Sequence, residues 1–249
     1  VRGWHLPGIQ AAGHMLRGRI YRLLGLPARA LGSMSRAVRL ARQAGERRLE
    51  REAIARQGGL LLDLDRPEEA EERLREALRG AGEIEDRRGQ TLAAVWLGTL
   101  LWEQGDPEAA SMLARAARLA NEMGLGRAEA MALALRARVE REAGRTDAAL
   151  DLTSRAAALL DRHGAELADR IVITGTRALV LHAAGRAAEA SDLVKDLRRR
   201  LRRENARIET AELRRTHRQA TTRLLEAVLS AEGPIYPRVR MPTTVPRPA

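Results

Sequence analysis

The chain has 249 residues, of which 45% are hydrophobic and only 2% aromatic, and it contains neither phenylalanine nor cysteine. A core must therefore rest on leucine, alanine, valine and methionine, most of which favour helices over strands. The lack of cysteine excludes a disulfide framework, a thiolate metal site and a cysteine nucleophile, and it fits a reducing cytoplasm. No apolar run approaches the roughly 18 residues of a membrane span, and the first residues do not resemble a signal peptide.

The charge is strongly positive, with 44 basic residues against 33 acidic ones and a net charge of +11. All the basic residues except Lys195 are arginine, a bias that points to a GC-rich bacterial coding sequence. Whatever its origin, this balance predicts attraction to acidic partners. The chain begins with Val1, so we expect either an alternative start codon or a piece of a longer protein, such as a kinase, an ATPase or a transcriptional regulator.

The stretch 91–117, TLAAVWLGTLLWEQGDPEAASMLARAA, carries the pattern that the rest of the chain repeats. Apolar residues recur there at three- and four-residue spacing and are interrupted once, around Gly105, which predicts two amphipathic helices joined by a tight turn. Equivalent turns come near residues 25, 65, 144 and 185, so successive turns lie 40, 40, 39 and 41 residues apart. A period of this length is typical of helical-repeat architectures.

In chain order, residues 1–7 form an N-terminal remnant ending at Pro7, a residue tolerated at the first position of a helix. The first unit has helices over 8–24 and on to about 43, and the second over 52–64 and on to about 79. Residues 206–231 hold a closing helix near 209–230, because a repeat array needs its last apolar face covered. Residues 232–249 are rich in proline and predict a disordered tail. Left-handed glycines are expected to end the second helix of the first four units, at Gly45, Gly82, Gly124 and Gly164.

Three positions of the repeat keep the same kind of residue in every unit. Small residues at two of them allow the helices of one hairpin to approach closely. Seven residues before the turn stand Gly18, Gly58, Gly98, Ala137 and Ala178, and five residues after it stand Ala30, Ala70, Ala110, Ala149 and Ala190. Five residues before the turn an apolar side chain recurs as Ile20, Leu60, Leu100, Val139 and Val180.

Over residues 8–205 this pattern resembles the tetratricopeptide repeat (TPR), in a long-period form like that of some bacterial regulators. The resemblance implies an all-α, right-handed α-solenoid of about five helical hairpins plus a C-terminal capping helix. It also implies a scaffold that binds a protein or peptide in a concave groove. The chain departs from the family in its period, near 40 in place of 34. It departs also at Glu140, where a bulky residue is expected, and at Leu197, which replaces an alanine.

The motifs of common enzymes are missing. Lys195 lies in a helical arginine run, without the glycine loop of a P-loop or the strand of a kinase lysine. Gly124 and Gly126 follow a helix where a dinucleotide-binding motif requires a strand, so they indicate a helix end. The five histidines are scattered without i,i+4 pairs, which argues against a metal site. We therefore expect no enzymatic activity, catalytic residue, cofactor or metal in this chain.

The TPR resemblance places the groove on the first helix of each hairpin. Arginines at both ends with apolar residues near the middle would suit an acidic peptide carrying an apolar anchor. Packing between repeats is the favoured role for Trp96, whereas Trp102 is equally suited to packing or to binding. The set does not match the carboxylate clamp of chaperone-binding members. The candidate groove residues are Arg19, Arg22, Arg56, Val95, Thr99, Trp102, Arg138, Arg141 and His182.

The densest positive charge lies over residues 195–218, and it offers an alternative. The segment is amphipathic and interrupted by glutamates, so a solvated outer helix is its structural interpretation. Its functional interpretation is a phosphate-backbone contact, although few aromatic residues accompany it for base stacking. The candidate nucleic-acid residues are Lys195, Arg198, Arg199, Arg202 and Arg203. Our leading hypothesis remains a cytoplasmic, non-enzymatic interaction module of a bacterial signalling or regulatory protein, with a protein or peptide ligand.

Overall fold

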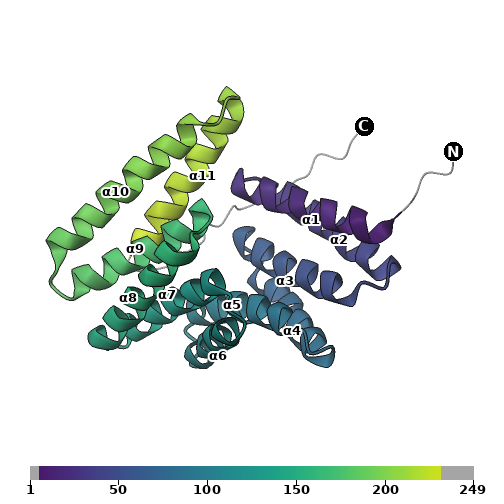
Figure 1. Cartoon of the computed structure of the whole chain (residues 1–249), viewed down its shortest axis with the longest axis horizontal. Helices are drawn as coiled ribbons and strands as arrows, with labels where there is room; N and C mark the ends of the chain where they lie inside the picture. Colours follow the sequence, from purple (N-terminus) through teal and green to yellow (C-terminus); the bar gives the residue numbers. More distant parts are fainter. Residues whose placement is uncertain (1–5, 231–249) are drawn as a thin grey trace.

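The structure, a computed structural model, describes residues 6–230, which form eleven α-helices and no strand (Figure 1). The all-α solenoid expected from the sequence is confirmed. Ten of the helices pair into five consecutive hairpins, and the eleventh closes the array. The helices are α1 (Pro7–Leu23), α2 (Pro27–Gln43), α3 (Arg47–Asp63), α4 (Pro67–Glu83), α5 (Arg87–Glu103), α6 (Glu108–Glu122), α7 (Gly126–Glu142), α8 (Thr146–His163), α9 (Leu167–Ala183), α10 (Ala187–Ala206) and α11 (Ala211–Leu229).

The turns within the hairpins are left-handed, at the places that the sequence indicates. Gly25, Gly105, Gly144 and Gly185 have φ between 72° and 77°, and Asp65 takes the same role at 57°. In the first turn the Leu26 N–H donates to the Tyr21 carbonyl at 2.8 Å, the bond of a Schellman helix end. The disordered tail predicted over 232–249, and most of the remnant over 1–7, lie outside the described residues.

One predicted helix end is wrong. Gly45, Gly124 and Gly164 do adopt positive φ, but α4 continues through Gly82 to Glu83. Glu85, with φ 53°, makes the turn instead. Glu85 lies 40 residues after Gly45, so the turn keeps the period of the repeat. It does so even though glutamate favours φ below zero. Helix α3 also begins at Arg47, before the predicted start at residue 52.

The two helices of each hairpin meet where the sequence keeps small residues. A Cβ atom on Gly58 would lie 2.4 Å from Leu74 Cγ, and one on Gly98 would lie 2.7 Å from Leu113 Cγ. Both leucines are fully buried. Only glycine allows this approach without displacing the facing leucine. The odd-numbered helices also contact the next odd-numbered helix, so they form a continuous layer.

The array curls until its two ends meet (Figure 1). Arg19 of α1 forms an ion pair with Glu166, at the start of α9. A Cβ atom on Gly25, in the first turn, would lie 2.6 Å from Ala220 Cβ of α11. Helix α11 itself packs on α9, where Val228 approaches Gly175 closely. The closing helix therefore covers the last hairpin and also reaches the first one.

Candidate functional site

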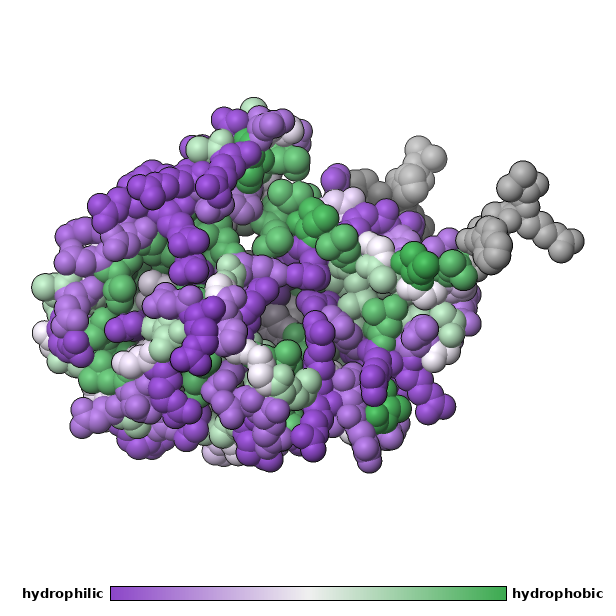
Figure 2. Space-filling view, viewed as in Figure 1, coloured by the Kyte–Doolittle hydropathy of each residue, from purple (hydrophilic) through white to green (hydrophobic). Residues whose placement is uncertain are grey.

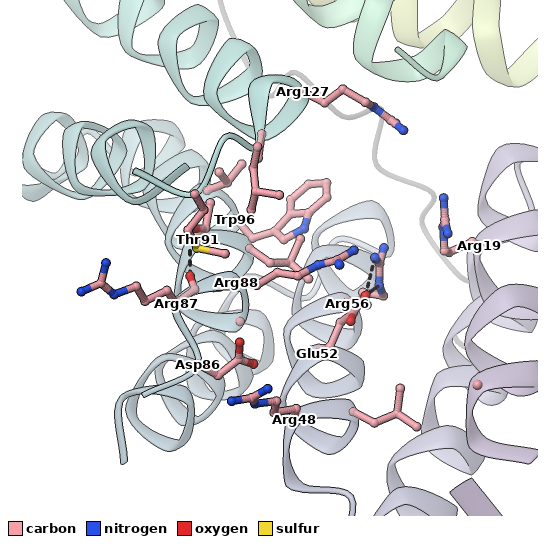
Figure 3. Close-up of a pocket in the computed structure, with 18 of the residues that line it drawn as sticks. Arg19, Arg48, Glu52, Arg56, Asp86, Arg87, Arg88, Thr91, Trp96 and Arg127 are labelled. Atoms are coloured by element: carbon pink, nitrogen blue, oxygen red, sulfur yellow. Dashed lines mark hydrogen bonds and ion pairs between the residues drawn. The ribbon is translucent and has the colours of Figure 1, made fainter. Parts of the chain in front are cut away.

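A cleft of about 1570 Å³ opens between the odd-numbered helices (Figure 3). Its walls come from α1, α3, α5, α7 and the start of α9, together with the turns that precede α3, α5 and α7. It therefore lies mainly along the N-terminal halves of α3, α5 and α7, and along most of the length of α1. Five repeats contribute to it because the superhelix wraps around it.

The floor of the cleft is built around Trp96, on α5. Its ring lies against Gly59 of α3, where a Cβ atom would come within 2.8 Å of it. The Arg22 guanidinium carbon stands 4.3 Å from the centre of the Trp96 ring, in cation–π geometry. Arg22 is itself held by Asp63, to which its Nε and Nη2 donate at 2.7 and 3.1 Å. Trp96 is 8% exposed, so it packs between repeats and still presents an edge to the cleft.

One end of the cleft is closed by a network of charged side chains. Arg127 of α7 donates to Asp169 of α9 at 2.9 Å and lies 3.3 Å from Glu166, which also pairs with Arg19. Burial alone would raise the pKa of Glu166, but the adjacent Arg19 and Arg127 outweigh it, and the pKa falls below its usual value. Burial raises the pKa of Asp169 despite Arg127. These pairs join the first, fourth and fifth repeats.

A row of arginines follows the side of the cleft. Arg48, Arg88 and Arg127 are each the second residue of a first helix, in α3, α5 and α7, and each lies seventeen residues before its turn. We call them the arginine row. Among the described residues, Arg48 and Arg88 take part in no ion pair. Figure 3 shows Arg88 extending toward Arg56, beside Trp96.

The position of the arginine row is costly for the helices that carry it. A cation in the first turn of a helix meets the positive end of the helix dipole, at about 0.3–1 kcal/mol. Helix stability would favour Asp or Glu there. The repetition of arginine at this position in three successive units therefore points to a role outside the helix.

Four of the nine predicted groove residues line this cleft, namely Arg19, Arg22, Arg56 and Val95. Arg56 pairs with Glu52, one turn earlier on α3, at 2.7 Å. The other five lie elsewhere. Thr99 and Arg138 are fully buried, so the expectation that they face a ligand is corrected. Trp102, Arg141 and His182 belong to the C-terminal halves of α5, α7 and α9, outside the cleft.

Arg138 is buried because α11 ends against it. Its Nη1 donates to the Val228 carbonyl at 2.8 Å and its Nη2 to the Ser230 carbonyl at 3.2 Å, which caps the C-terminus of α11. Trp102 lies 5.0 Å from the Arg138 guanidinium carbon, and its Nε1 donates to Glu142 at 2.6 Å. Burial, with help from Arg141, lowers the pKa of Arg138 to about 10, so the side chain stays charged at neutral pH. Helix α11 thus occupies the part of the groove that the sequence assigned to a ligand.

Sequence reasoning missed the arginine row and the carboxylates at the closed end. The signal for the row was present, because aligning the units on their turns places the three arginines in one column. Glu166 and Asp169 gave no such signal, since they reach the cleft only when the fifth repeat curls back toward the first.

The candidate nucleic-acid residues all lie on α10, and all five are exposed. Lys195 pairs with Asp192 at 3.0 Å, and Arg199 pairs with Asp196, each three residues earlier on the helix. The buried residues of the same helix include Leu197 and Leu201. This arrangement is that of an outer helix with charge on its solvent side, and a nucleic-acid role for it stays a prediction.

Comparison with known proteins identifies structures with a similar fold, but no protein related in sequence. No family model and no curated protein matches the sequence. Two structures of a putative kinesin light chain of Podosopora anserina with nearly identical TPR-like repeats match with TM-scores of 0.55 and 0.54 at 16% identity. They cover 77% and 78% of this chain and 94% and 95% of their own. BtubC (BKLC) from P. vanneervenii matches with a TM-score of 0.54 at 15% identity, over 82% of this chain and 94% of its own.

Within residues 6–230, no helix is long and apolar enough to cross a bilayer. The helical pairing, the turn geometry and the structural matches together establish that this chain has the TPR-like repeat fold.

Proposed function

We propose that this protein is a non-enzymatic scaffold that binds an extended acidic peptide of a partner protein in the cleft between its odd-numbered helices. The observation that carries the proposal is the arginine row beside an apolar floor. Arg48 and Arg88 have no carboxylate partner among the described residues, so their guanidinium groups can bind carboxylates of a ligand. Val95, Met131 and the edge of Trp96 offer the apolar surface for an anchor side chain.

The spacing of the row predicts the spacing of acidic residues in the ligand. Packed helices lie about 8–10 Å apart, and an extended peptide rises about 3.3 Å per residue. Guanidinium groups on successive first helices would therefore match carboxylates about three residues apart. The expected ligand is an extended segment with Asp or Glu at i, i+3 and i+6 and an aliphatic residue between them.

Two labelled nine-residue peptides of identical composition test this. One carries Asp at positions 1, 4 and 7 around a central leucine, and its twin carries the three Asp residues side by side. Fluorescence anisotropy at low salt should show tighter binding of the spaced peptide and a loss of about tenfold with Arg88→Glu. The control, Arg155→Glu, changes a charge on α8 outside the cleft and should leave binding unchanged. Equal affinity for the twins, or indifference to Arg88→Glu, would refute the proposal.

The wider role that we propose is an interaction module of a bacterial signalling or regulatory protein in the cytoplasm. The arginine-for-lysine bias and the absence of cysteine support this setting.

The alternative function is nucleic-acid binding by α10. The same anisotropy assay with a labelled oligonucleotide distinguishes it from peptide binding in the cleft. The alternative predicts binding that falls steeply with salt and is lost when Arg198 and Arg202 become glutamate, whereas Arg88→Glu has little effect.

A further inference from the structure

Helix α1 exposes an apolar face whose N-terminal end, Leu6 and Ile9, reaches the wall of the cleft and whose remainder, Leu16 and Ile20, lies outside the cleft. Ile9, Leu16 and Ile20 are 68%, 56% and 46% exposed, and Leu6 next to the helix is 48% exposed. At 100° per residue these three helical residues fall on one side, opposite Ala11, Met15 and Gly18, which pack on the array. Figure 2 shows hydrophobic surface along α1. A helix that is apolar on both sides is normally covered on both sides.

The repeat itself shows what covers this face in the later units. Positions nine and five before the turn hold Leu16 and Ile20 in the first unit, but Trp96 and Leu100 in the third. Trp96 is 8% exposed and Leu100 is fully buried, because α3 and α4 of the preceding hairpin pack there. Within residues 6–230, α1 contacts α2 and α3 on its inner side, and no hairpin takes the corresponding outer place.

The charge around the face defines the chemistry of its partner. Residues 6–45 contain seven arginines and no acidic residue. Three of them pair with carboxylates of later repeats, whereas the other four, Arg17, Arg29, Arg36 and Arg39, take part in no ion pair among the described residues. The pKa of His14, on the same helix, is lowered by burial and then by Arg17, Arg36 and Arg39, which places a positive potential beside the apolar face.

We propose that this face of α1 docks an acidic amphipathic helix of a partner protein, in the place that a preceding hairpin would take. Its apolar side would cover Ile9, Leu16 and Ile20, and its acidic rim would meet Arg17, Arg36 and Arg39. A second copy of this chain is disfavoured as the occupant. Pairing two such faces would bring together two hairpins that carry arginines and no acidic residue, and their positive charges would repel each other. The chain's own ends are disfavoured as well, since residues 1–5 and 231–249 carry four arginines and one glutamate.

The test uses three stapled helical peptides that share one leucine stripe and carry glutamate, glutamine or lysine at their polar positions. Isothermal titration at low salt should show the glutamate peptide binding at least about tenfold tighter than the lysine peptide. Leu16→Asp should abolish this binding. The control Leu213→Asp, at an exposed leucine of α11, should preserve it. Arg17→Glu with Arg36→Glu should weaken the glutamate peptide and strengthen the lysine peptide. Circular dichroism confirms folding, which is expected because every altered side chain is solvent-accessible.

Three outcomes would overturn the proposal. The first is equal binding of the three peptides, or no binding of any. The second is that the protein binds none of the peptides but floats with equimolar phosphatidylserine–phosphatidylcholine vesicles, and that Leu16→Asp abolishes this flotation. That result would assign the face to a membrane surface. The third is a dimer in light scattering that Leu16→Asp dissociates. Leu16, Arg17, Arg36 and Leu213 do not line the cleft, so these variants leave the residues that would bind the cleft peptides unchanged, and failure here is distinguishable from failure of the cleft proposal.

Discussion

At the scale of single residues, the fold depends on where glycine, which has no side chain, stands in a helix. Gly98 allows Leu113 of the facing helix to pack directly against the α5 backbone, and both residues are fully enclosed by the core. Gly82 has no neighbour of this kind, because a Cβ atom there would meet nothing within 4 Å. These two helical glycines therefore differ in what they contribute.

Replacing Gly98 with leucine should overpack the third hairpin and lower the free energy of unfolding by roughly 1–3 kcal/mol. Gly82→Ala is the matched change at an open helical position, and it should raise stability by up to about 1 kcal/mol through helix propensity. Urea unfolding followed by circular dichroism measures both. An unchanged midpoint for Gly98→Leu would show that α5 and α6 do not meet at this point.

Glu166 and Asp169 share Arg127, yet they should give opposite pH dependence. The folded-state pKa of Glu166 lies below its usual value of 4.5, so its ionised form stabilises the fold above that pH. The stability gap between the native protein and Glu166→Gln should therefore be constant above about pH 4.5 and shrink as the pH falls further. The pKa of Asp169 lies above its usual 3.8, so the stability of the native protein relative to Asp169→Asn should fall as the pH rises above that value. Urea unfolding of the three proteins at a series of pH values separates the two slopes, and parallel curves would contradict this assignment.

At the scale of one element, α11 is held in place by residues that lie far from it in the sequence. Arg138 of α7 caps its C-terminus, Gly175 of α9 admits Val228, and Gly25 lies against Ala220. Helix α11 thus has two roles. It covers the last apolar face of the repeat array, and it fills the part of the groove next to Arg138.

Replacing Arg138 with methionine keeps much of the side-chain volume but removes the donor to the carbonyl of the buried Val228. An unsatisfied buried acceptor costs about 1–3 kcal/mol, so amide exchange at the end of α11 should accelerate about tenfold or more. The control is Arg136→Met, which removes the same charge from a partly exposed site on the same helix. Hydrogen–deuterium exchange of residues 224–229 provides the measurement. Equal exchange in the two variants would mean that the cap does not hold α11.

At the scale of the whole molecule, the cleft exists because the array closes on itself. The ion pair between Arg19 and Glu166 spans 147 residues, and it lies where the first and fifth repeats approach each other. Both side chains are partly exposed, so salt should screen their attraction.

Arg19→Glu should therefore open the ring and increase the radius of gyration measured by small-angle X-ray scattering at low salt. Exchanging the two charges, with Arg19→Glu and Glu166→Arg together, should restore the compact value. If the single variant scatters like the native protein, the contact of Gly25 with α11 closes the ring without help from the ion pair.

The sequence by itself determined the number of hairpins, the turns and the closing helix, because these depend on local chemistry and on a period that repeats along the chain. Helix propensity, glycine at left-handed positions and small residues at fixed places act within about forty residues of one another. The arginine row could also have been found in this way, by aligning the units on their turns. Gly82 failed as a helix end because the spacing of the repeat outweighed one residue's preference.

Only the tertiary structure decided which part of the groove stays open. Arg138 and Thr99 occupy positions that face a groove in the repeat pattern, yet α11 covers one and core packing encloses the other. Arg19 and Glu166 become neighbours only through the accumulated rotation of four repeats. Such contacts depend on the sum of many small packing angles, and no local pattern in the sequence records that sum.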